Sequence, residues 1–306
     1  MKKVLMVVGT IIAVLTMGLQ SWAGNAGGTF QVSRNETTVR INAGERPVFE
    51  YRYADVPFKP YCSQIYSPDG VAVLRDNVID HKHHHGLMFA LSADGVDFWS
   101  ELPANGKQVQ SRILTTPDGL AQDLNWEAPG GKIMLSEVRT ITVHSGPETL
   151  LTWRSGLFAP KGSKSVKLSG SHYFGLGARF VTDMDKVGAF VNSAGATGTV
   201  VRGTEKMITA KWCAYTAASG GRQVTFAMFD HPSNPRHPAQ MFTMLDPFSY
   251  LSATLGLHKE PLLIEEGKRL DLRYGVALWD GNPGADRIEE TYGRWLKECY
   301  TAETLK

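Results

Sequence analysis

Cysteine is scarce in this sequence of 306 residues. Its three cysteines, Cys62, Cys213 and Cys299, lie far apart in the chain and allow one disulfide bond at most. This count excludes a small scaffold that is held together by disulfides. The paired spacing of a zinc–thiolate site is also missing. We therefore expect the thiols to be buried and reduced.

Neither sign of charge dominates, and long apolar runs are missing after the N-terminus. The chain has 32 Lys and Arg against 30 Asp and Glu, and Lys2 and Lys3 account for the difference. No basic run with interleaved aromatic residues is present, so nucleic acid is not expected as a partner. No stretch after residue 23 is long and apolar enough to cross a membrane as a helix.

Several catalytic motifs are also absent. The sequence has no G-x-S-x-G elbow, no phosphate-binding G-x-x-x-x-G-K-[ST] loop and no H-E-x-x-H pair. The alternating strands and helices that a dinucleotide-binding fold requires are missing as well. These absences count against serine hydrolases, nucleotide hydrolases and zinc proteases of the H-E-x-x-H type.

The first 23 residues have the features of a secretory signal. Two lysines precede an almost entirely apolar stretch, and Ser21 and Ala23 place small residues at the third and first positions before a cut ahead of Gly24. We expect cleavage there and a periplasmic or secreted protein; the alternative is a single membrane anchor. Residues 24–306 are expected to form a single domain.

Strand-like runs separated by turn residues dominate from residue 29 to about residue 280. In Val48–Tyr53, polar and apolar residues alternate with the period of two that a half-buried strand shows. Clusters such as Ser67–Gly70 supply the turns. Many short strands at this spacing predict a mainly β fold, a sandwich or a barrel. Further strands are expected at Thr37–Ile41, Lys132–Val143, Thr149–Gly156, Ser171–Phe180, Gln223–Phe229 and Leu270–Trp279.

One C-terminal helix is expected at about residues 283–299. Asn282 suits the N-cap and Pro283 suits the first helical position. An apolar face at helical spacing predicts that the helix packs on an outer face or edge of the β domain. This face consists of Ile288, Tyr292, Trp295, Leu296 and Cys299.

Four of the nine histidines fall within Asp80–Gly86. In an extended segment, His81, His83 and His85 would lie on one side, where three imidazoles could bind a divalent metal ion. Alternatively, one neutral imidazole could act as a general base near neutral pH. The tract could also be an exposed one that binds metal adventitiously, or its rings could only orient a loop.

A second polar segment, Asp230–Pro238, contains three prolines in seven residues and must form a stiff loop. Rigid loops that carry polar groups are frequent binding elements. Arg236 could clamp a carboxylate or sugar hydroxyls in a planar geometry. Alternatively, the Asn and Asp side chains of the segment only cap its own turns.

Two weaker signals concern substrate binding. His172 lies among glycines that could admit a ligand or mark bulges, and a buried structural histidine is an equal alternative. Trp99 and Glu101 could supply an aromatic platform and a carboxylate. Tryptophan in such a position is, however, more often part of the core.

The two polar motifs together resemble those of a known family. Residues 80–99, D-H-K-H-H-H-G-L-M-F-A-L-S-A-D-G-V-D-F-W, are similar to its pattern D-H-x-H-H-x-G-L…V-x-F-W. Residues 229–238, F-D-H-P-S-N-P-R-H-P, are similar to its second signature, and Leu270–Gly281 resembles its closing strand. The similarity covers about residues 30–300. Its members are exported bacterial proteins catalogued as "methane oxygenase PmoA-like".

The resemblance implies an antiparallel β-supersandwich similar to galactose mutarotases, with one C-terminal helix. Histidines and a carboxylate of such folds move protons on a sugar. The family has either Arg or His at the position of His85, so the resemblance does not imply a strict metal-binding face of three histidines. The residues to which the resemblance assigns roles are His81, His84 and His237 as catalytic groups and Asn234 and Arg236 as substrate-binding groups.

The sequence thus favours a periplasmic carbohydrate-active enzyme that uses histidine acid/base chemistry, with or without a divalent metal ion. The reaction would be of the epimerase, lyase or hydrolase type on a sugar derivative, either a small molecule or an oligosaccharide. A non-catalytic carbohydrate-binding protein is one alternative. A metal-dependent oxygenase, as the family label suggests, is another.

Overall fold

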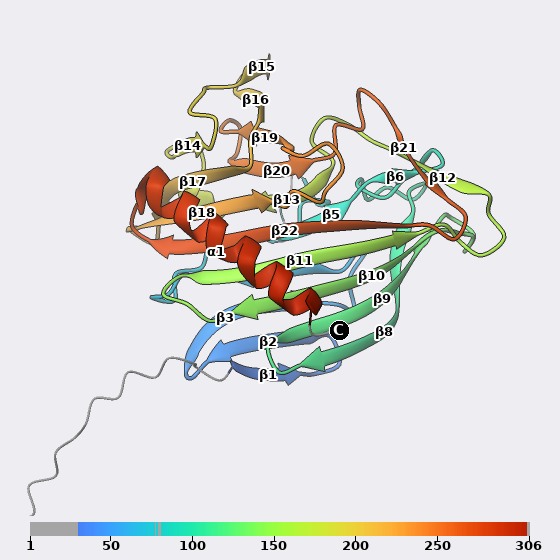
Figure 1. The fold of residues 1–306 in the computed structure, drawn as a ribbon, viewed down its shortest axis with the longest axis horizontal. Coiled ribbons are helices and arrows are strands. Elements are labelled where there is room, and N and C mark those ends of the chain that lie inside the picture. Colours follow the sequence, from blue (N-terminus) through green and yellow to red (C-terminus); the bar gives the residue numbers. More distant parts are fainter. Residues whose placement is uncertain (1–29, 77, 79–80, 305–306) are drawn as a thin grey trace, which may run out of the picture.

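The structure, a computed structural model, describes residues 30–76, 78 and 81–304. The expected secretory signal therefore lies outside the described residues. Every strand pairing between these residues is antiparallel, and the strands form three sheets. The mainly β expectation is confirmed, and the architecture is a sandwich (Figure 1).

The largest sheet has ten strands, and the histidine-rich segment leads into one of its central strands. In spatial order its strands are β1 (Phe30–Arg34), β2 (Thr38–Ala43), β3 (Arg46–Arg52), β4 (Tyr61–Ile65), β5 (Leu87–Ala90), β13 (Gly175–Arg179), β20 (Tyr250–Thr254), β19 (Gln240–Met244), β16 (Glu205–Thr209) and β15 (Thr199–Arg202).

The second sheet has eight strands and a third, smaller sheet has four. The eight strands are, in order, β14 (Ala189–Asn192), β17 (Trp212–Ser219), β18 (Arg222–Asp230), β22 (Arg269–Asp280), β11 (Thr149–Phe158), β10 (Ile133–His144), β9 (Gly119–Glu127) and β8 (Lys107–Thr116). The four are β21 (Leu262–Glu265), β12 (Ser165–Ser169), β6 (Ser92–Ala93) and β7 (Val96–Asp97). A short 3₁₀ helix spans Thr182–Met184.

The core lies between the two large sheets, because each strand turns alternate side chains inward. Along β10, every second residue from Leu135 to Val143 is buried, including Glu137 and Arg139, whereas the residues between them are half-buried. One continuous cluster joins the apolar side chains among them to those of the ten-stranded sheet, such as Ile41 and Phe49. All three cysteines are buried and reduced, as expected.

The C-terminal helix α1 (Gly284–Thr304) covers the outer face of the eight-stranded sheet (Figure 1). The helix begins at Gly284, one residue after the expected Pro283, so Asn282 stands before the N-cap position; its Oδ1 accepts from the backbone amide of Gly284 at 3.0 Å. The helix is longer than expected at its C-terminal end. Its buried residues Ile288, Tyr292, Trp295 and Cys299 pack on Leu150, Ala214, Ala227, Phe229 and Ala277. None of the helices among the described residues combines the length and the apolar character that a membrane crossing needs.

Candidate functional site

The histidine-rich segment forms a turn, not a strand. The amide of His84 donates to the carbonyl of His81 at 2.8 Å, and the first strand residue after the motif is Leu87. The premise that His81, His83 and His85 share one face of a strand is therefore wrong. Asp80, the first residue of the motif, lies outside the described residues.

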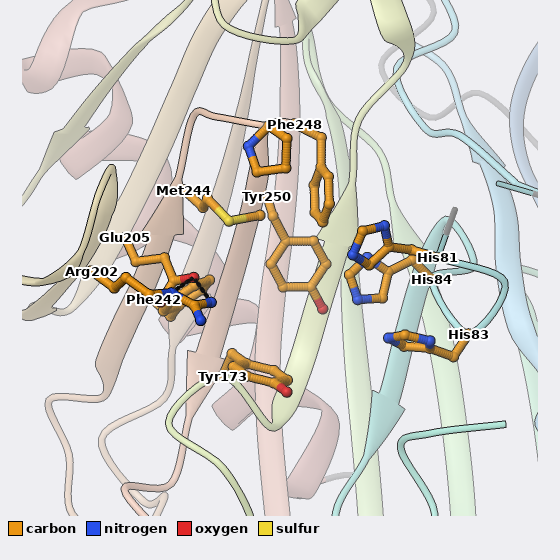
Figure 2. A pocket seen from close by; sticks show the side chains of 11 residues that line it. His81, His83, His84, Tyr173, Arg202, Glu205, Phe242, Met244, Phe248 and Tyr250 are labelled. Carbon is orange, nitrogen blue, oxygen red and sulfur yellow. Dashed lines mark hydrogen bonds and ion pairs between the residues drawn. The ribbon is translucent and has the colours of Figure 1, made fainter. Parts of the chain in front are cut away.

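The turn divides its histidines between two environments. His81, His83 and His84 line a cavity of about 310 Å³, which we call the histidine pocket (Figure 2). The other wall is formed by strands β15, β16, β19 and β20, by the loop between β19 and β20, and by the segment that precedes β13. The remaining lining residues are Tyr173, Arg202, Glu205, Phe242, Met244, Pro247, Phe248 and Tyr250.

His84 is the most enclosed of the three pocket histidines, with 6% of its surface exposed. Its ring stacks on that of Tyr250, with centroids 5.1 Å apart, and meets the edge of Phe248. Neither ring nitrogen has a hydrogen-bond partner among the described residues, and Nδ1 is buried. Burial, followed by the neighbouring His83 and His81, holds the pKa of His84 well below 6.5. The imidazole is therefore neutral at physiological pH.

Tyr250 presents a second unpartnered polar atom beside His84. Its hydroxyl is buried without a hydrogen bond among the described residues, and burial raises its pKa well above the ordinary value. The ring fits because Gly177 on β13 has no side chain: a Cβ there would lie 1.8 Å from the Tyr250 hydroxyl oxygen. A buried polar atom without a partner costs free energy, so the Tyr250 hydroxyl is available to bond to a ligand or a water molecule in the pocket.

The opposite wall carries a carboxylate. Glu205 accepts a hydrogen bond from Arg202 at 2.5 Å, and its other oxygen lies 3.4 Å from Nε2 of His172. The side chain of Glu205 is only 9% exposed. Figure 2 shows Tyr250 between this Arg–Glu pair and the histidines. The pocket therefore holds a neutral imidazole on one wall and a carboxylate with its own guanidinium on the other.

His85 points away from its neighbours into a buried polar network. Its Nδ1 lies 2.8 Å from Asp76 Oδ1, and its Nε2 lies 3.0 Å from Glu101 Oε1. Glu101 also accepts from Lys59, whose side chain is completely buried, at 2.6 Å. Burial lowers the pKa of His85, but the hydrogen bonds that its ring donates to the two carboxylates outweigh burial and raise the pKa above 6.5. Glu101 is thus a structural partner rather than a group that faces the pocket.

No group of three or more His, Cys, Asp or Glu side chains is arranged to hold a metal ion within the described ranges. The role expected for His85 as a metal ligand conflicts with its contacts, because a carboxylate engages each of its ring nitrogens. His81 and His83 remain in the pocket, where burial, followed by Lys59, lowers the pKa of His83 to about 4.

The proline-rich segment forms a loop, as expected, but it does not reach the histidine pocket. Asn234 bonds to the backbone of Arg273 through both its amide nitrogen and its oxygen. Arg236 donates to the carbonyls of three residues, Leu255, Glu260 and Pro261. Both side chains therefore hold neighbouring segments together. His237 lines a different cavity, which shares no lining residue with the histidine pocket.

The structure also shows where His172 and Trp99 lie. His172 stands just outside the histidine pocket, beside Glu205 and 5.3 Å from the ring of Phe242. Trp99 is buried and stacks on Phe174 at 4.9 Å, behind His84. It therefore supports the pocket from the core and offers no exposed platform. Sequence reasoning missed Glu205 and Tyr250, since neither belongs to a motif and only the pairing of distant strands brings them to the histidines.

These features define a class: antiparallel β-sandwich proteins with a histidine-lined pocket on strands of the larger sheet. The chain belongs to the family described as "Family of unknown function (DUF6807)", whose sequence model matches residues 38–293. No curated protein matches the sequence.

Solved structures show distant likeness. One is a variant of the GH36 α-galactosidase AgaA from Geobacillus stearothermophilus in complex with raffinose, with 9% identity, a TM-score of 0.43, and coverage of 83% of this chain and 41% of that chain. The crystal structure of HI1317 has 10% identity and a TM-score of 0.34, and the match covers 81% of this chain and 99% of that chain. The polysaccharide lyase BACCELL_00875 has 11% identity and a TM-score of 0.28, and the match covers 84% of this chain and 33% of that chain. The chain thus spans less than half the length of the α-galactosidase.

Proposed function

We propose that this protein is an exported carbohydrate-active enzyme that transfers protons on a sugar derivative bound in the histidine pocket. The observation that carries the proposal is His84, a buried neutral imidazole without a hydrogen-bond partner among the described residues, which lines the cavity opposite Glu205. Export rests on the signal-like features of residues 1–23.

The lining of the pocket suits a sugar ring. Such a ring presents apolar C–H faces and a rim of hydroxyl groups. Tyr173, Phe242 and Phe248 supply aromatic surface for the faces, and His84 and Glu205 supply hydrogen-bonding groups for the rim. The cavity volume of about 310 Å³ lies at the small end of the range for small-molecule sites, about 300–1,000 Å³. A single sugar unit is therefore the expected occupant.

The two walls suit proton transfer. A general base must be unprotonated at the working pH, and the lowered pKa of His84 keeps it so. The Glu205 carboxylate, with Arg202 and His172 against it, can take up or return a proton or orient a hydroxyl on the opposite side. In an epimerase, His84 would take the ring proton on one side and Glu205, in its protonated carboxyl form, would return one on the other. In a lyase, His84 would take the proton, the bond to the leaving oxygen would break, and the protonated imidazole would give its proton to that oxygen. We favour these two reactions over hydrolysis.

The test is turnover of a panel of purified neutral and acidic oligosaccharides, followed by proton NMR for epimerised, unsaturated or cleaved products. Replacing the base, His84→Ala, should lower turnover by about 10²–10⁴-fold, which is the usual contribution of a general acid or base. The control is His144→Gln, because His144 on β10 lies beside α1 and lines neither cavity.

Full turnover by the His84→Ala variant, with a native circular dichroism spectrum, would refute the role of His84. Binding of a sugar without any turnover by the wild type would replace the enzyme with a non-catalytic carbohydrate-binding protein.

A further inference from the structure

A second cavity, of about 280 Å³, lies at the other end of the β19–β20 hairpin. Its floor is a row of paired residues, since Thr209 of β16 lies opposite Gln240 of β19, which lies opposite Thr254 of β20. We call this cavity the dyad pocket, after the pair of His237 and Asp230 beside it. It also contains His237, Leu255 and Lys259.

The dyad pocket is separate from the histidine pocket. Gln240 of the dyad pocket and Met244 of the histidine pocket stand four residues apart on β19, a separation of about 13 Å along a strand. Between them lie Phe242 and the rings of His172 and Tyr173 packed against it. A small ligand in one cavity therefore does not occupy the other.

His237 is held ready for a ligand by a buried carboxylate. Its Nδ1 lies 2.7 Å from Oδ2 of Asp230, whose side chain is 2% exposed. The same carboxylate accepts from the side chain of Asn234 at 2.7 Å and from the amide of Ala239 at 2.8 Å. These bonds fix the ring of His237 and make Nδ1 the donor to Asp230. The other nitrogen, Nε2, has no partner among the described residues and is therefore available to a ligand in the cavity.

Two further groups of the dyad pocket are available to a ligand. The Oε1 atom of Gln240 is buried without a hydrogen-bond partner among the described residues. Lys259 has no acidic partner within the same ranges, and it is exposed at the rim. The other cation, Arg236, is already used by backbone carbonyls and by Glu260 at 3.3 Å. The cavity thus offers one unused acceptor, one unused cation and one oriented imidazole.

We propose that the dyad pocket is a second ligand site, which takes a small hydroxylated carboxylate of the sugar-acid class. A hydroxyl group of the ligand donates to Gln240 Oε1, its carboxylate meets Lys259, and His237 Nε2 bonds to a further oxygen. The proposal does not depend on chemistry in the histidine pocket.

The test is NMR of protein labelled with ¹⁵N in its histidine rings, titrated with D-glucuronate and, as the neutral control, with D-glucose. Glucuronate should shift the His237 signals saturably, and glucose should bind at least about tenfold more weakly, since a hydrogen bond to a charged group is lost. The variant Lys259→Ala, which changes an exposed side chain, should weaken glucuronate roughly tenfold. The variant His84→Ala should keep the full response of His237.

Three results would overturn the proposal. One is the absence of any saturable shift at His237. Another is equal binding of glucose and glucuronate, which would remove the role of the carboxylate. The last is loss of the response in His84→Ala but not in Lys259→Ala, which would place the ligand in the histidine pocket. Turnover in the histidine pocket is measured by a separate assay, so the two proposals can fail separately.

Discussion

His84 and His85 are consecutive residues, but their surroundings shift the pKa values of their imidazoles in opposite directions. Around His84 the contacts are aromatic rings and other histidines, so burial dominates and the charged form is disfavoured. Around His85 the two carboxylates of Asp76 and Glu101 outweigh burial and favour the charged form. The first ring is therefore suited to accept a proton, and the second is suited to hold the turn in place.

The pKa of His84 predicts an unusual pH dependence. If its neutral imidazole is the base, activity falls only when the ring becomes protonated, well below pH 6.5. The acidic limb of kcat/KM against pH should therefore lie below 6.5. An acidic limb at 6.5 or higher, measured in buffers of constant ionic strength, would show that another group is the base.

At the scale of elements, helix α1 depends on an apolar strip that matches a strip of small residues on the sheet. Ala214, Ala227 and Ala277 come from three neighbouring strands and let the large side chains of the helix approach closely. The recurrence of apolar residues predicted this face from the sequence, because helical spacing is a local property. The alanine strip could not be predicted, because it exists only once β17, β18 and β22 are paired.

Trp295 should be the main anchor of α1. Its side chain is completely buried, and its indole nitrogen donates to Thr152 at 2.8 Å. The variant Trp295→Ala should lower the free energy of unfolding by about 3–5 kcal/mol, as expected for a large cavity. The exposed Glu290→Ala on the same helix is the control and should change it by less than about 0.5 kcal/mol. Urea denaturation of both variants measures the difference, and equal effects would contradict the anchoring role.

The two polar motifs also show what a linear motif does not contain. The proline-rich motif forms the predicted loop, whereas the histidine motif forms a turn in place of the extended segment. The two motifs line separate cavities, because they lie at opposite ends of the β19–β20 hairpin. Within the proline-rich segment, Asn234 bonds to the backbone of Arg273, and Arg236, although it lines the dyad pocket, bonds to backbone carbonyls. A side chain's type indicates what it can bond to, whereas only the packed chain shows whether a backbone partner has already taken that bond.

At the scale of the whole molecule, the network around His85 joins segments that are distant in the sequence. Lys59 comes from the loop before β4, Asp76 from the segment before the histidines, and Glu101 from the loop after β7. Tyr61 stacks on the His85 ring at 4.4 Å and donates to Asp76 at 2.6 Å. This network fixes the base of the turn that carries His84.

His85 should make stability depend on pH above neutrality. Its pKa in the folded protein is raised above 6.5, so its contribution is fully present below pH 6.5 and is lost as the pH rises through the folded pKa. From about pH 6 to about pH 9, where carboxylates do not titrate, the wild type should lose more stability than His85→Gln. Urea denaturation across this range gives the difference. Parallel curves for the two proteins would show that His85 is not charged in the folded state.

The sequence by itself determined the mainly β fold, the C-terminal helix with its apolar face, and the proline-rich loop. These follow from local periodicity and from backbone restrictions that act within a few residues. Tertiary structure decided which histidines share a pocket, that Glu205 and Tyr250 complete it, and that His237 belongs to a second cavity. The physical reason is that burial, hydrogen-bond competition and pKa depend on neighbours from distant strands, which come together only when the sheet is formed.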